Sequence, residues 1–481
     1  MALSQIKPTE SQIKRIKDYA IANQYDLEKL NSWLNKHEYL TDRQRRYQVE
    51  ELVLDQKSKN GLLTEDDKTR LEARSANLYR SLFGKYPDDT VDGIQNDAIC
   101  RMPFTGMTIN PDGKLVLCCN STKIDVGHIS EVEDLQEHFT HSPAMNAVRD
   151  QMKNGELPPD RCSICVRKRK TGNGTAAIDQ WVKRIVPWPP TPDNTIEFLE
   201  FTASNMCNQT CTMCGGLYSS KWGDLEREAI DLGLTFRNDS PWRSGDHPIY
   251  SISDDDMKKI YKLLPNLKRI MIKGGEPFAD KRNIELIRRC NEMEYPPKLS
   301  IVTNFAVIVP KVMKLISEYR GYINLNCSID GLYEQYDWIR GSSFKQTIGN
   351  MDRYYEATGV KSNVSLSPTL YSIFNLREAV EFFNAKQAVQ KFNMNHVTDP
   401  KYTSFGMLDK EILEPLLASY ESLRSNIKPL ININHVLDRE PFSEKHRKQY
   451  TPQVKQWITF MNMKRGFKIE DHVPELKAFM K

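Results

Sequence analysis

The sequence predicts an α/β protein, in which a partial (β/α)6 barrel is preceded by a small α+β domain and flanked by helical N- and C-terminal extensions. Beyond residue 193, short apolar segments alternate with helical patterns, which is typical of parallel strands joined by right-handed crossovers. Before that point, the residues from Cys100 to Cys118 show the pattern of a β-hairpin with Pro and Gly in its turn. These two observations place a parallel sheet after a smaller, mixed domain.

Four regions follow from these patterns. They are the helical N-terminal extension, the small domain, the barrel and the helical C-terminal region, at residues 1–94, 95–186, 193–400 and 401–481. The first region carries Lys, Glu, Gln and Leu at helical spacing around an expected loop at Lys57–Gly61. Ahead of the barrel, Thr171–Thr175 is rich in Gly and Pro187–Pro192 is rich in Pro, which favours a linker.

Local signals define the elements inside the two central regions. The hairpin is expected to join residues 104–109 to residues 114–118. A helix should follow, because Ser142 suits the N-cap, Pro143 the first helical position and Gly155 the C-terminal stop. The expected barrel strands are residues 196–201, 267–273, 298–304, 323–330, 363–370 and 391–397.

Composition narrows the class of protein. The chain has 481 residues and a net charge of only +4, so composition gives no reason to expect a nucleic-acid or membrane partner. The N-terminus lacks the apolar core of a signal peptide, and no apolar run approaches the length of a membrane span, so we expect a cytoplasmic protein. Eight of the ten cysteines lie between Cys100 and Cys214. Because cytosolic thiols are kept reduced, this clustering favours metal ligation over disulfides.

Three of these cysteines form a compact motif after the first barrel strand. Cys207, Cys211 and Cys214 have C-x3-C-x2-C spacing, which puts three thiolates at the C-terminal end of that strand, where barrel active sites lie. A 4Fe–4S cluster takes four ligands, so three local cysteines leave one iron open to a ligand other than a protein side chain. The alternative is a zinc ion or a structural cluster with a distant fourth ligand.

This motif resembles the cluster-binding loop of radical S-adenosylmethionine (SAM) enzymes, and the resemblance extends over roughly residues 196–397. Gly274, Gly275, Glu276 and Pro277 follow the second expected strand and are similar to the family's GGEP motif. The resemblance implies that backbone and carboxylate groups there receive the amino group of the methionine moiety. Glycine suits such a site, because a backbone without Cβ lets a ligand approach closely.

Four further positions carry the same resemblance. Asn304, at the end of the third expected strand, is similar to the family's TN motif, while Ser328 and Asp330 match its S-x-D-G motif after the fourth. These groups are implied to hydrogen-bond polar atoms of the ribose or methionine. Arg340 resembles the arginine that holds the methionine carboxylate, a task that suits a guanidinium fork.

The sequence departs from the family pattern at two places. Met213 stands just before the third cysteine, where the family usually carries an aromatic residue, and we expect its polarisable sulfur to pack against adenine instead. A long insertion, roughly residues 217–253, contains Trp222, Phe236 and Trp242 among charged residues. It is interpreted either as a substrate lid or as a surface loop without function.

A second group of cysteines lies in the small domain. Cys100, Cys118, Cys162 and Cys165 make a set of four thiolates, enough to ligate a cluster completely. The arrangement resembles the twitch domain, the half-sized relative of the SPASM domain, which carries an auxiliary 4Fe–4S cluster. A zinc knuckle remains the alternative, because four thiolates also suit zinc. Cys119 is expected to point away from this site, since neighbouring residues of a strand face opposite sides.

The resemblance implies a radical mechanism. An external flavodoxin- or ferredoxin-type reductant would deliver an electron to the open cluster, SAM would be cleaved to a 5′-deoxyadenosyl radical, and that radical would abstract a substrate hydrogen. Relatives with twitch or SPASM domains commonly modify peptides, so we expect a peptide or protein substrate. Two alternatives remain: dehydrogenation of a small sugar or alcohol, and a catalytically silent iron–sulfur factor that binds RNA or protein, which the basic run Arg167–Lys170 motivates.

Overall fold

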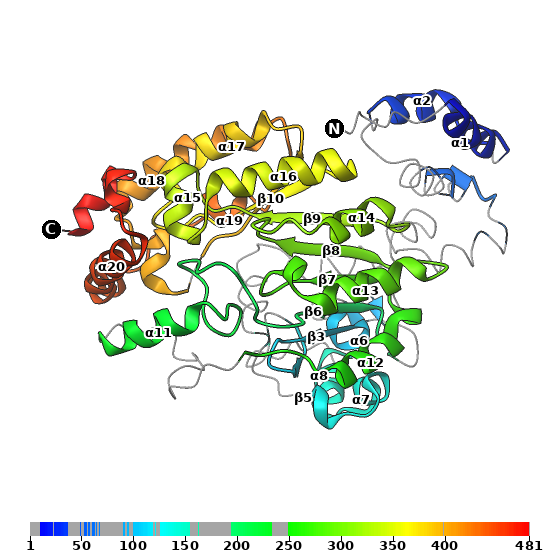
Figure 1. Cartoon of the computed structure of the whole chain (residues 1–481), viewed down its shortest axis with the longest axis horizontal. Coiled ribbons are helices and arrows are strands. Elements are labelled where there is room, and N and C mark those ends of the chain that lie inside the picture. The colour runs from blue at the N-terminus through cyan, green and yellow to red at the C-terminus, as the bar shows by residue number, and fades with distance from the viewer. Residues whose placement is uncertain are drawn as a thin grey trace.

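The computed structural model describes most of the residues from Cys100 onward, including the central sheet, and parts of the N-terminal region. The described residues are 10–22, 24–36, 49, 52–54, 56–57, 60–62, 64, 67, 90–91, 94–95, 100–118, 121, 126–153, 162, 194–232, 249–397 and 399–480. At the centre lies a ten-stranded sheet of order β12-β11-β10-β9-β8-β7-β6-β3-β4-β5. Figure 1 shows this sheet with helices packed along it.

The six expected barrel strands are confirmed, and each pairs in parallel with the next one along the chain. They are β6 (Phe198–Phe201), β7 (Arg269–Ile272), β8 (Lys298–Thr303), β9 (Ile323–Ser328), β10 (Ser362–Leu366) and β11 (Val389–Met394). Helices occupy the crossovers, as right-handed parallel connections require. These helices are α11 (Trp222–Asp231), α12 (Asp254–Leu263), α13 (Lys281–Glu292), α14 (Pro310–Glu318), α15 (Tyr333–Arg340), α16 (Phe344–Thr358) and α17 (Leu376–Asn384).

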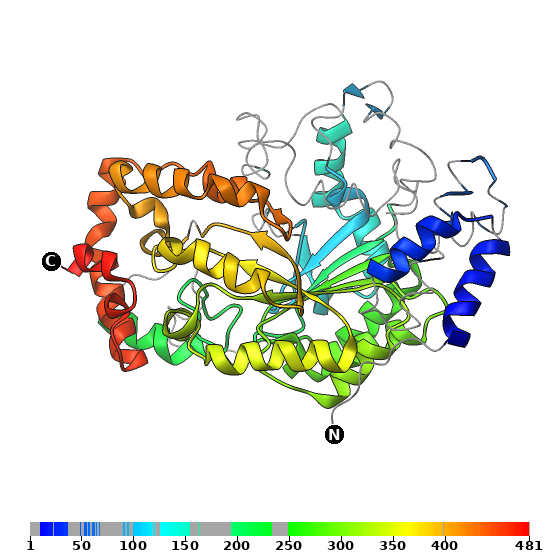
Figure 2. The ribbon, with the colours of Figure 1, turned by 90° about the horizontal axis from the view of Figure 1, so that it is seen from above.

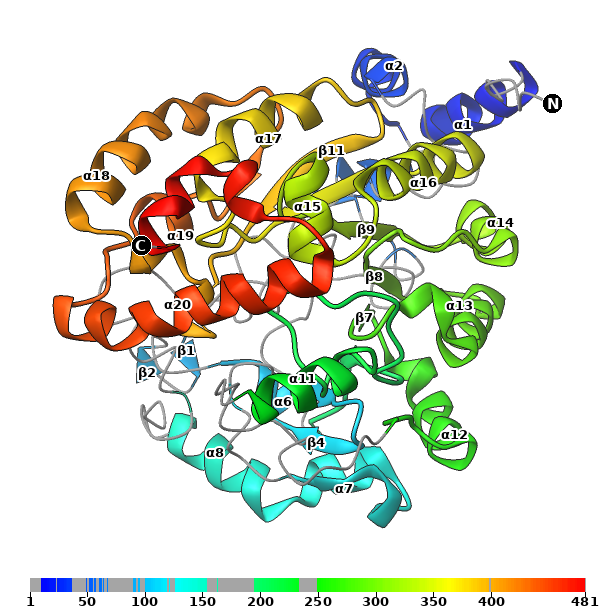
Figure 3. The ribbon, with the colours of Figure 1, turned by 60° about the vertical axis from the view of Figure 1, so that its left-hand side comes forward.

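One face of the sheet is apolar and covered by helices. Leu299 and Ile301 of β8 are completely buried and belong to the same hydrophobic cluster as Leu286 of α13 and Ile316 of α14. Figure 3 shows α12, α13, α14 and α16 ranged along this side of β7, β8 and β9. Burying this apolar surface is the main force that holds the helices against the sheet.

The opposite face of the same strands is polar. Asn363 and Asn393 both donate side-chain hydrogen bonds to Asn326 Oδ1, each over 2.9 Å. Next to them, Arg269 of β7 donates to Ser300 Oγ of β8 over 2.8 Å. Since successive side chains of a strand point to opposite faces, these groups line the inner side of the partial barrel. The barrel therefore presents amide and hydroxyl groups, rather than an apolar surface, on its inner face.

The hairpin of the small domain is confirmed and is continuous with the barrel sheet. Strands β3 (Gly106–Ile109) and β4 (Lys114–Val116) are antiparallel, and β5 (Gly127–His128) adds a third strand. Strand β3 pairs in parallel with β6, with Gly106 opposite Phe198 and Ile109 opposite Phe201. The small domain and the barrel therefore share one hydrogen-bonded sheet, which the sequence did not predict.

The expected helix of the small domain is α8, and it begins at Pro143 as predicted. Its apolar face, Met145, Val148 and Met152, is at most 1% exposed. Helix α7 (Leu135–His141) precedes it. The expected stop at Gly155, Cys119 and both linker stretches lie outside the described residues.

Short segments in the small domain and N-terminal region differ from expectation. Met102–Thr105 forms the short helix α6, so only Gly106–Ile109 of the expected first hairpin strand is extended. Pro103 explains this, because its fixed φ suits the first turn of a helix. In the region expected to be helical, Thr90–Val91 and Ile94–Gln95 form the antiparallel pair β1 and β2. Their β-branched residues Thr, Val and Ile favour extended backbone.

The C-terminal region is mostly helical but adds one strand to the sheet. Helices α18 (Lys410–Ser419), α19 (Asn434–Leu437) and α20 (Glu444–Arg465) confirm the helical prediction. Leu430–Ile431 forms β12, which pairs in parallel with β11 and corrects the prediction of an all-helical region. Pro429 keeps this segment extended, and its carbonyl accepts the Phe392 amide over 2.9 Å.

The described helices nearest the two termini lie at opposite ends of the molecule (Figure 2). Helices α1 (Glu10–Ala22) and α2 (Leu27–Lys36) share a hydrophobic cluster of their own. Figure 2 shows them in dark blue at one end and the C-terminal helices in orange and red at the other. Within the described parts of the chain, no helix combines the length and apolar character needed to cross a bilayer.

We predict that Arg149→Ala destabilises the protein by about 2 to 4 kcal/mol, because it leaves buried carbonyls without donors. The Arg149 guanidinium donates to Pro103 O (2.6 Å), Phe139 O (2.7 Å) and Thr140 O (3.1 Å), and so joins α8 to α6 and α7. Chemical denaturation should show a lower midpoint than for Arg227→Ala, a change at an exposed position of α11. Equal midpoints for the two variants would contradict this account of the small domain.

Candidate functional site

The cysteine loop leaves the C-terminal end of β6 and has little regular structure of its own. Cys211 is buried, and Cys207 and Cys214 are partly buried. The Cys214 amide donates to Cys211 O over 2.9 Å, which closes a turn between the second and third thiols. The pKa of Cys211 is raised to about 12, chiefly by burial, with smaller contributions from the thiols of Cys214 and Cys207 and with Arg340 opposing the rise. The three thiols are therefore close enough to act on one another.

The C-terminal end of α15 holds the middle of this loop. The Thr212 amide donates to Ile339 O over 2.8 Å, and the Thr210 amide donates to Arg340 O over 3.3 Å. Carbonyls at the end of a helix lack partners within the helix, so they are available to the loop. Helix α15 thus positions the residues on both sides of Cys211.

A second anchor comes from α20, more than two hundred residues away in sequence. Arg465 donates from Nη1 to Thr210 Oγ1 (2.9 Å), from Nη2 to Thr210 O (2.6 Å) and from Nε to Trp338 O (2.8 Å). Burial lowers the pKa of Arg465 to about 10, so the guanidinium remains charged at neutral pH. Nothing in the sequence motifs indicated this residue, because it shares no spacing with the cysteines.

A third anchor is Trp222, the first residue of α11. Its indole Nε1 donates to Cys211 O over 3.0 Å, and its ring stacks on Trp457 at 5.8 Å between centroids. The side chain is completely buried. Trp222 is therefore part of the wall behind the cysteine loop, which corrects its interpretation as part of a lid or surface loop. Phe236 and Trp242 lie outside the described residues.

The glycine pair packs directly against the segment that leads into the cysteine loop. Gly274 and Gly275 have φ of +75° and +54°, which glycine adopts readily. A Cβ on Gly274 would lie 2.3 Å from Thr202 Cγ2, and one on Gly275 would lie 2.3 Å from Met206 O. The glycines are thus required by packing within the protein, a reason that the sequence did not reveal.

Glu276 connects the glycine pair to the end of β8. Its carboxylate accepts hydrogen bonds from Thr303 Oγ1 (2.7 Å), the Asn304 amide (2.8 Å) and the Phe278 amide (3.0 Å). Burial raises the pKa of Glu276, while these three donors oppose the rise. Pro277 begins the short 3-10 helix that follows. The carboxylate therefore fixes the loop as well as facing the cysteines.

Asn304 lies between this carboxylate and the first cysteine. Its Nδ2 donates to Asn208 Oδ1 over 2.8 Å and lies 3.9 Å from Cys207 Sγ. Burial raises the pKa of Cys207, and the nearby Glu276 carboxylate adds to the rise. The TN and GGEP motifs, which come from different strands, therefore meet at the first thiol.

Arg340, Asp330 and Ser328 form the other side of the site. Arg340 Nη1 donates to Asp330 Oδ2 over 2.8 Å, and Asp330 Oδ1 accepts the Ser367 amide over 2.9 Å. Arg340 Nε is buried and has no hydrogen-bond partner among the described residues. Ser328 is the last residue of β9 and is partly buried. Met213 is partly buried and packs against the hydrophobic core.

The second cysteine group is described only in part. Cys118 and Cys162 are each 7% exposed, and Cys100 is partly buried against the same hydrophobic cluster as Cys162. Cys165 lies outside the described residues. Cys290 and Cys327 are completely buried, and burial raises the pKa of both thiols, in keeping with the expectation that they are small core residues.

Fold and site together define a radical SAM protein with an additional iron–sulfur domain, and the comparisons with known families agree. Residues 201–384 match the radical SAM superfamily, and residues 100–166 match the SPASM family of iron–sulfur cluster-binding domains. The chain thus belongs to the radical SAM superfamily, a superfamily of enzymes, and carries an auxiliary-cluster domain. The cofactors of these domains are a 4Fe–4S cluster with SAM and a second iron–sulfur cluster.

Relatives of the chain are distant. A radical SAM cyclopropyl synthase, TigE, from Paramaledivibacter caminithermalis is 26% identical over 192 residues, a match that spans 39% of either chain. Streptococcus suis SuiB bound to its precursor peptide SuiA is 16% identical, with 68% of this chain and 72% of that chain covered and a TM-score of 0.33. The anSMEcpe structure with bound AdoMet is 19% identical, with 49% and 61% covered and a TM-score of 0.36.

The residues present fit the cofactors of the first domain. The loop offers three thiols that would ligate a cluster, and within the described residues the buried Arg340 Nε has no hydrogen-bond partner, which suits it to a carboxylate. Within the described residues, no three His, Cys, Asp or Glu side chains converge closely enough to hold a single metal ion. In a 4Fe–4S cluster each thiolate binds a separate iron, so the three thiols of the loop need not converge on one ion.

We predict that Arg465→Met weakens retention of the cluster, because it removes all three hydrogen bonds to Thr210 and Trp338 while leaving an apolar stem in place. Iron per chain after anaerobic reconstitution and desalting should fall by up to about four. Arg465→Lys should recover part of the loss, since it restores charge without the planar fork.

The matched control for this change is Arg353→Met, at an exposed position of α16. If Arg465→Met retains as much iron as Arg353→Met, Arg465 does not position the cysteine loop.

Proposed function

We propose that this protein reductively cleaves SAM and uses the resulting radical to abstract a hydrogen atom from a peptide or protein substrate. One observation carries the proposal: motifs from four different strands meet around the three thiols. The cysteine loop follows β6, Gly275 and Glu276 follow β7, Asn304 follows β8, and Arg340 lies on the helix after β9. Active sites of this fold lie at these strand ends.

The proposed roles follow from these positions. Cys207, Cys211 and Cys214 would ligate the 4Fe–4S cluster and leave one iron for SAM. Arg340 would hold the methionine carboxylate with its unpartnered Nε, and its bond to Asp330 keeps the guanidinium oriented. When bound and reduced by one electron, the cluster and SAM together supply a 5′-deoxyadenosyl radical.

The remaining proposed contacts surround the same ligand. The backbone of Gly274, Gly275 and Pro277 and the carboxylate of Glu276 would receive the methionine amino group, as the resemblance implies. Asn304, Ser328 and Asp330 would hydrogen-bond polar atoms of the ribose or methionine, and Met213 would pack on the adenine. The buried Trp222 and the C-terminal end of α15 cover the part of the loop around Cys211.

We further propose that Cys100, Cys118, Cys162 and Cys165 ligate the auxiliary 4Fe–4S cluster. Four thiolates leave no iron open, which restricts this cluster to electron transfer or structural support. Because β3 and β6 share one sheet, this cluster would be held in fixed relation to the barrel. An auxiliary cluster so placed would accept an electron from the substrate radical.

The inner face of the barrel supports a peptide or protein as the substrate. Asn326, Asn363 and Asn393 hydrogen-bond to one another on that face and make it polar, and the partly buried Asn393 lies where its amide could pair with a peptide bond. The same face also suits the hydroxyls of a sugar, so dehydrogenation of a small alcohol or sugar is the second candidate. A flavodoxin- or ferredoxin-type protein would supply the electron, in the cytoplasm, where thiols stay reduced.

We predict that Cys207→Ala, Cys211→Ala and Cys214→Ala each abolish the formation of 5′-deoxyadenosine from SAM by anaerobically reconstituted protein with dithionite. The reason is that all three thiolates are needed to hold a cluster that still has one open iron. Chromatographic quantification of 5′-deoxyadenosine measures the effect. Cys290→Ala, at a buried cysteine outside the site, should retain cleavage, and cleavage by any of the three loop variants would overturn the assignment.

We predict that the double variant Cys162→Ala, Cys165→Ala loses about four irons per chain yet still cleaves SAM in the absence of substrate. Cleavage needs only the barrel cluster and a reductant, whereas substrate turnover should fail where an electron must return to the auxiliary cluster. Metal analysis with Mössbauer spectroscopy measures the loss. Zinc in the parent protein, or an iron content that the double variant leaves unchanged, would contradict the auxiliary-cluster assignment.

A further inference from the structure

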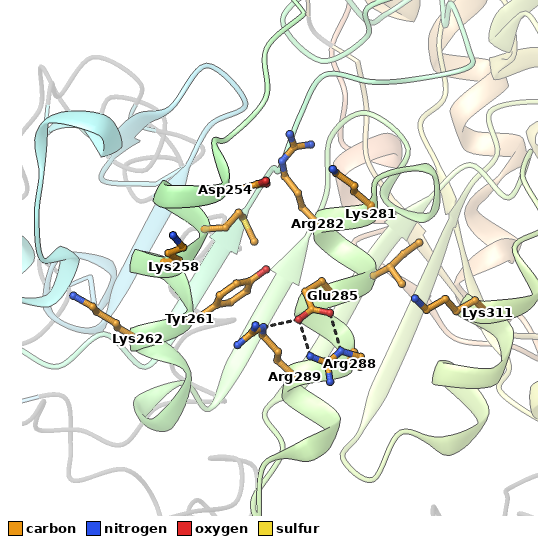
Figure 4. Close-up of a pocket in the computed structure, with 12 residues that line it drawn as sticks. Asp254, Lys258, Tyr261, Lys262, Lys281, Arg282, Glu285, Arg288, Arg289 and Lys311 are labelled. Carbon is orange, nitrogen blue, oxygen red and sulfur yellow. Dashed lines mark hydrogen bonds and ion pairs between the residues drawn. The ribbon is translucent and has the colours of Figure 1, made fainter.

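A basic groove runs between α12 and α13 on the outer, helical side of the barrel, and we call it the α12–α13 groove. It encloses about 770 Å³. Figure 4 shows its walls, with side chains of α12 on one side, those of α13 opposite and Lys311 of α14 beyond them. It is lined by Asp254, Met257, Lys258, Tyr261, Lys262, Lys281, Arg282, Ile284, Glu285, Arg288, Arg289 and Lys311.

The lining carries an excess of positive charge. Seven of these residues are Lys or Arg, and two are acidic. Glu285 is already paired with Arg288 and Arg289, each at 2.7 Å, and the hydrogen bond from Arg288 helps to lower the pKa of Glu285 to about 2. The exposed lysines Lys262, Lys281 and Lys311 form no ion pair within the described part of the chain. The groove thus offers uncompensated positive charge to a partner.

The floor of the groove is partly apolar. Met257 is 2% exposed, while Tyr261 and Ile284 are partly buried. Arg289 lies over the Tyr261 ring at 4.1 Å from its centroid, which keeps this guanidinium flat against the floor. An apolar floor with a charged rim is the usual composition of a surface that binds another protein.

One end of the groove reaches the segment that carries the first cysteine. Arg282 donates to Ser251 Oγ over 3.3 Å, and Ser251 forms a β-bridge with Ser204. The Ser204 hydroxyl also donates to Asp280, the residue that caps α13. Cys207 is three residues further along the chain, and Met206 beside it is 37% exposed. The groove therefore adjoins the cluster-binding loop from outside the barrel.

We infer that the α12–α13 groove docks an acidic protein that carries single electrons on a flavin or an iron–sulfur centre. This inference rests on the proposed function, because that reaction needs one electron from outside the chain. The carrier would be oxidised by one electron and the barrel cluster reduced by one. Docking beside Ser204 would bring the donor near the cluster, and opposite charges would speed the encounter.

The position of the groove favours an electron carrier over an acidic peptide substrate. A substrate must bring its reacting atom to the polar inner face, and the groove lies on the helical side of the sheet, away from that face. An electron needs no open passage through the sheet. The same charge would attract an acidic peptide, so the experiment must separate the two partners.

The test is the triple variant Lys262→Glu, Lys281→Glu, Lys311→Glu, compared with the parent at low and high salt. We expect reduced flavodoxin to drive SAM cleavage at least about tenfold more slowly in this variant, because its rim would repel an acidic carrier. The difference should shrink as salt screens the charges. Cleavage driven by dithionite, which needs no docking, should stay within about twofold of the parent.

The matched control is Lys445→Glu, Lys468→Glu, Lys477→Glu, which makes the same change in net charge at exposed positions of the C-terminal region. It should behave like the parent with both reductants. Affinity for oxidised flavodoxin, measured by calorimetry, should fall at least about tenfold only in the groove variant, and this readout needs no catalysis.

The two proposals fail in different ways. A parent protein that forms no 5′-deoxyadenosine with dithionite contradicts the proposed function, while calorimetry still decides the docking site. Docking is overturned if the groove variant binds flavodoxin and accepts its electrons as the parent does, or if both triple variants lose binding equally. A groove variant that loses only its response to an acidic peptide would also overturn it and assign the groove to that peptide.

Discussion

The hydrogen bonds from Arg465 to Thr210 and Trp338 hold the part of the molecule on which the chemistry depends. The cysteine loop has no regular backbone hydrogen bonding of a helix or sheet to keep its three sulfurs in place. Within the described residues, the hydrogen bonds of Arg465 all go to neutral oxygens, so its charge is not cancelled by a carboxylate. A positive charge beside Cys211 would favour the anionic thiolates that ligate iron. The C-terminal region thus supports the cysteine loop directly.

The continuous sheet fixes the position of the small domain relative to the barrel. Strand β3 continues the parallel order of the barrel beyond β6, and β4 leads directly to Cys118. A separate domain on a flexible linker would sample many positions. Strands that are hydrogen-bonded into one sheet allow few relative positions, which suits electron transfer between two centres. The sheet therefore links the cysteine groups mechanically, while the outer helices are left to form the α12–α13 groove.

Sequence reasoning found the features that are local in the chain. Short apolar segments predicted the six barrel strands, and a turn with Pro and Gly predicted the hairpin. The motif residues from Cys207 to Arg340 follow the strands after which they were expected. The family comparisons confirm the superfamily and the auxiliary domain. The individual roles of the motif residues stay predictions.

The features that sequence reasoning missed depend on contacts between distant segments. Arg465 and Trp222 approach the cysteine loop only after the chain has folded, and neither belongs to a periodic pattern that would reveal it. The pairing of β3 with β6 was missed for a related reason. Hydrophobic patterning predicts that a segment is a strand, but it does not specify which other strand it pairs with. The two-residue strands β1 and β12 were missed because so short a segment has no detectable period.

The central claim is that SAM binds to the open iron of a cluster held by Cys207, Cys211 and Cys214. The most direct measurement is the electron paramagnetic resonance spectrum of the anaerobically reduced protein before and after SAM is added. The account predicts a reduced 4Fe–4S signal whose shape changes with SAM, because the ligands of one iron change. A signal that SAM leaves unaltered, from protein shown to contain a reduced 4Fe–4S cluster, would contradict it.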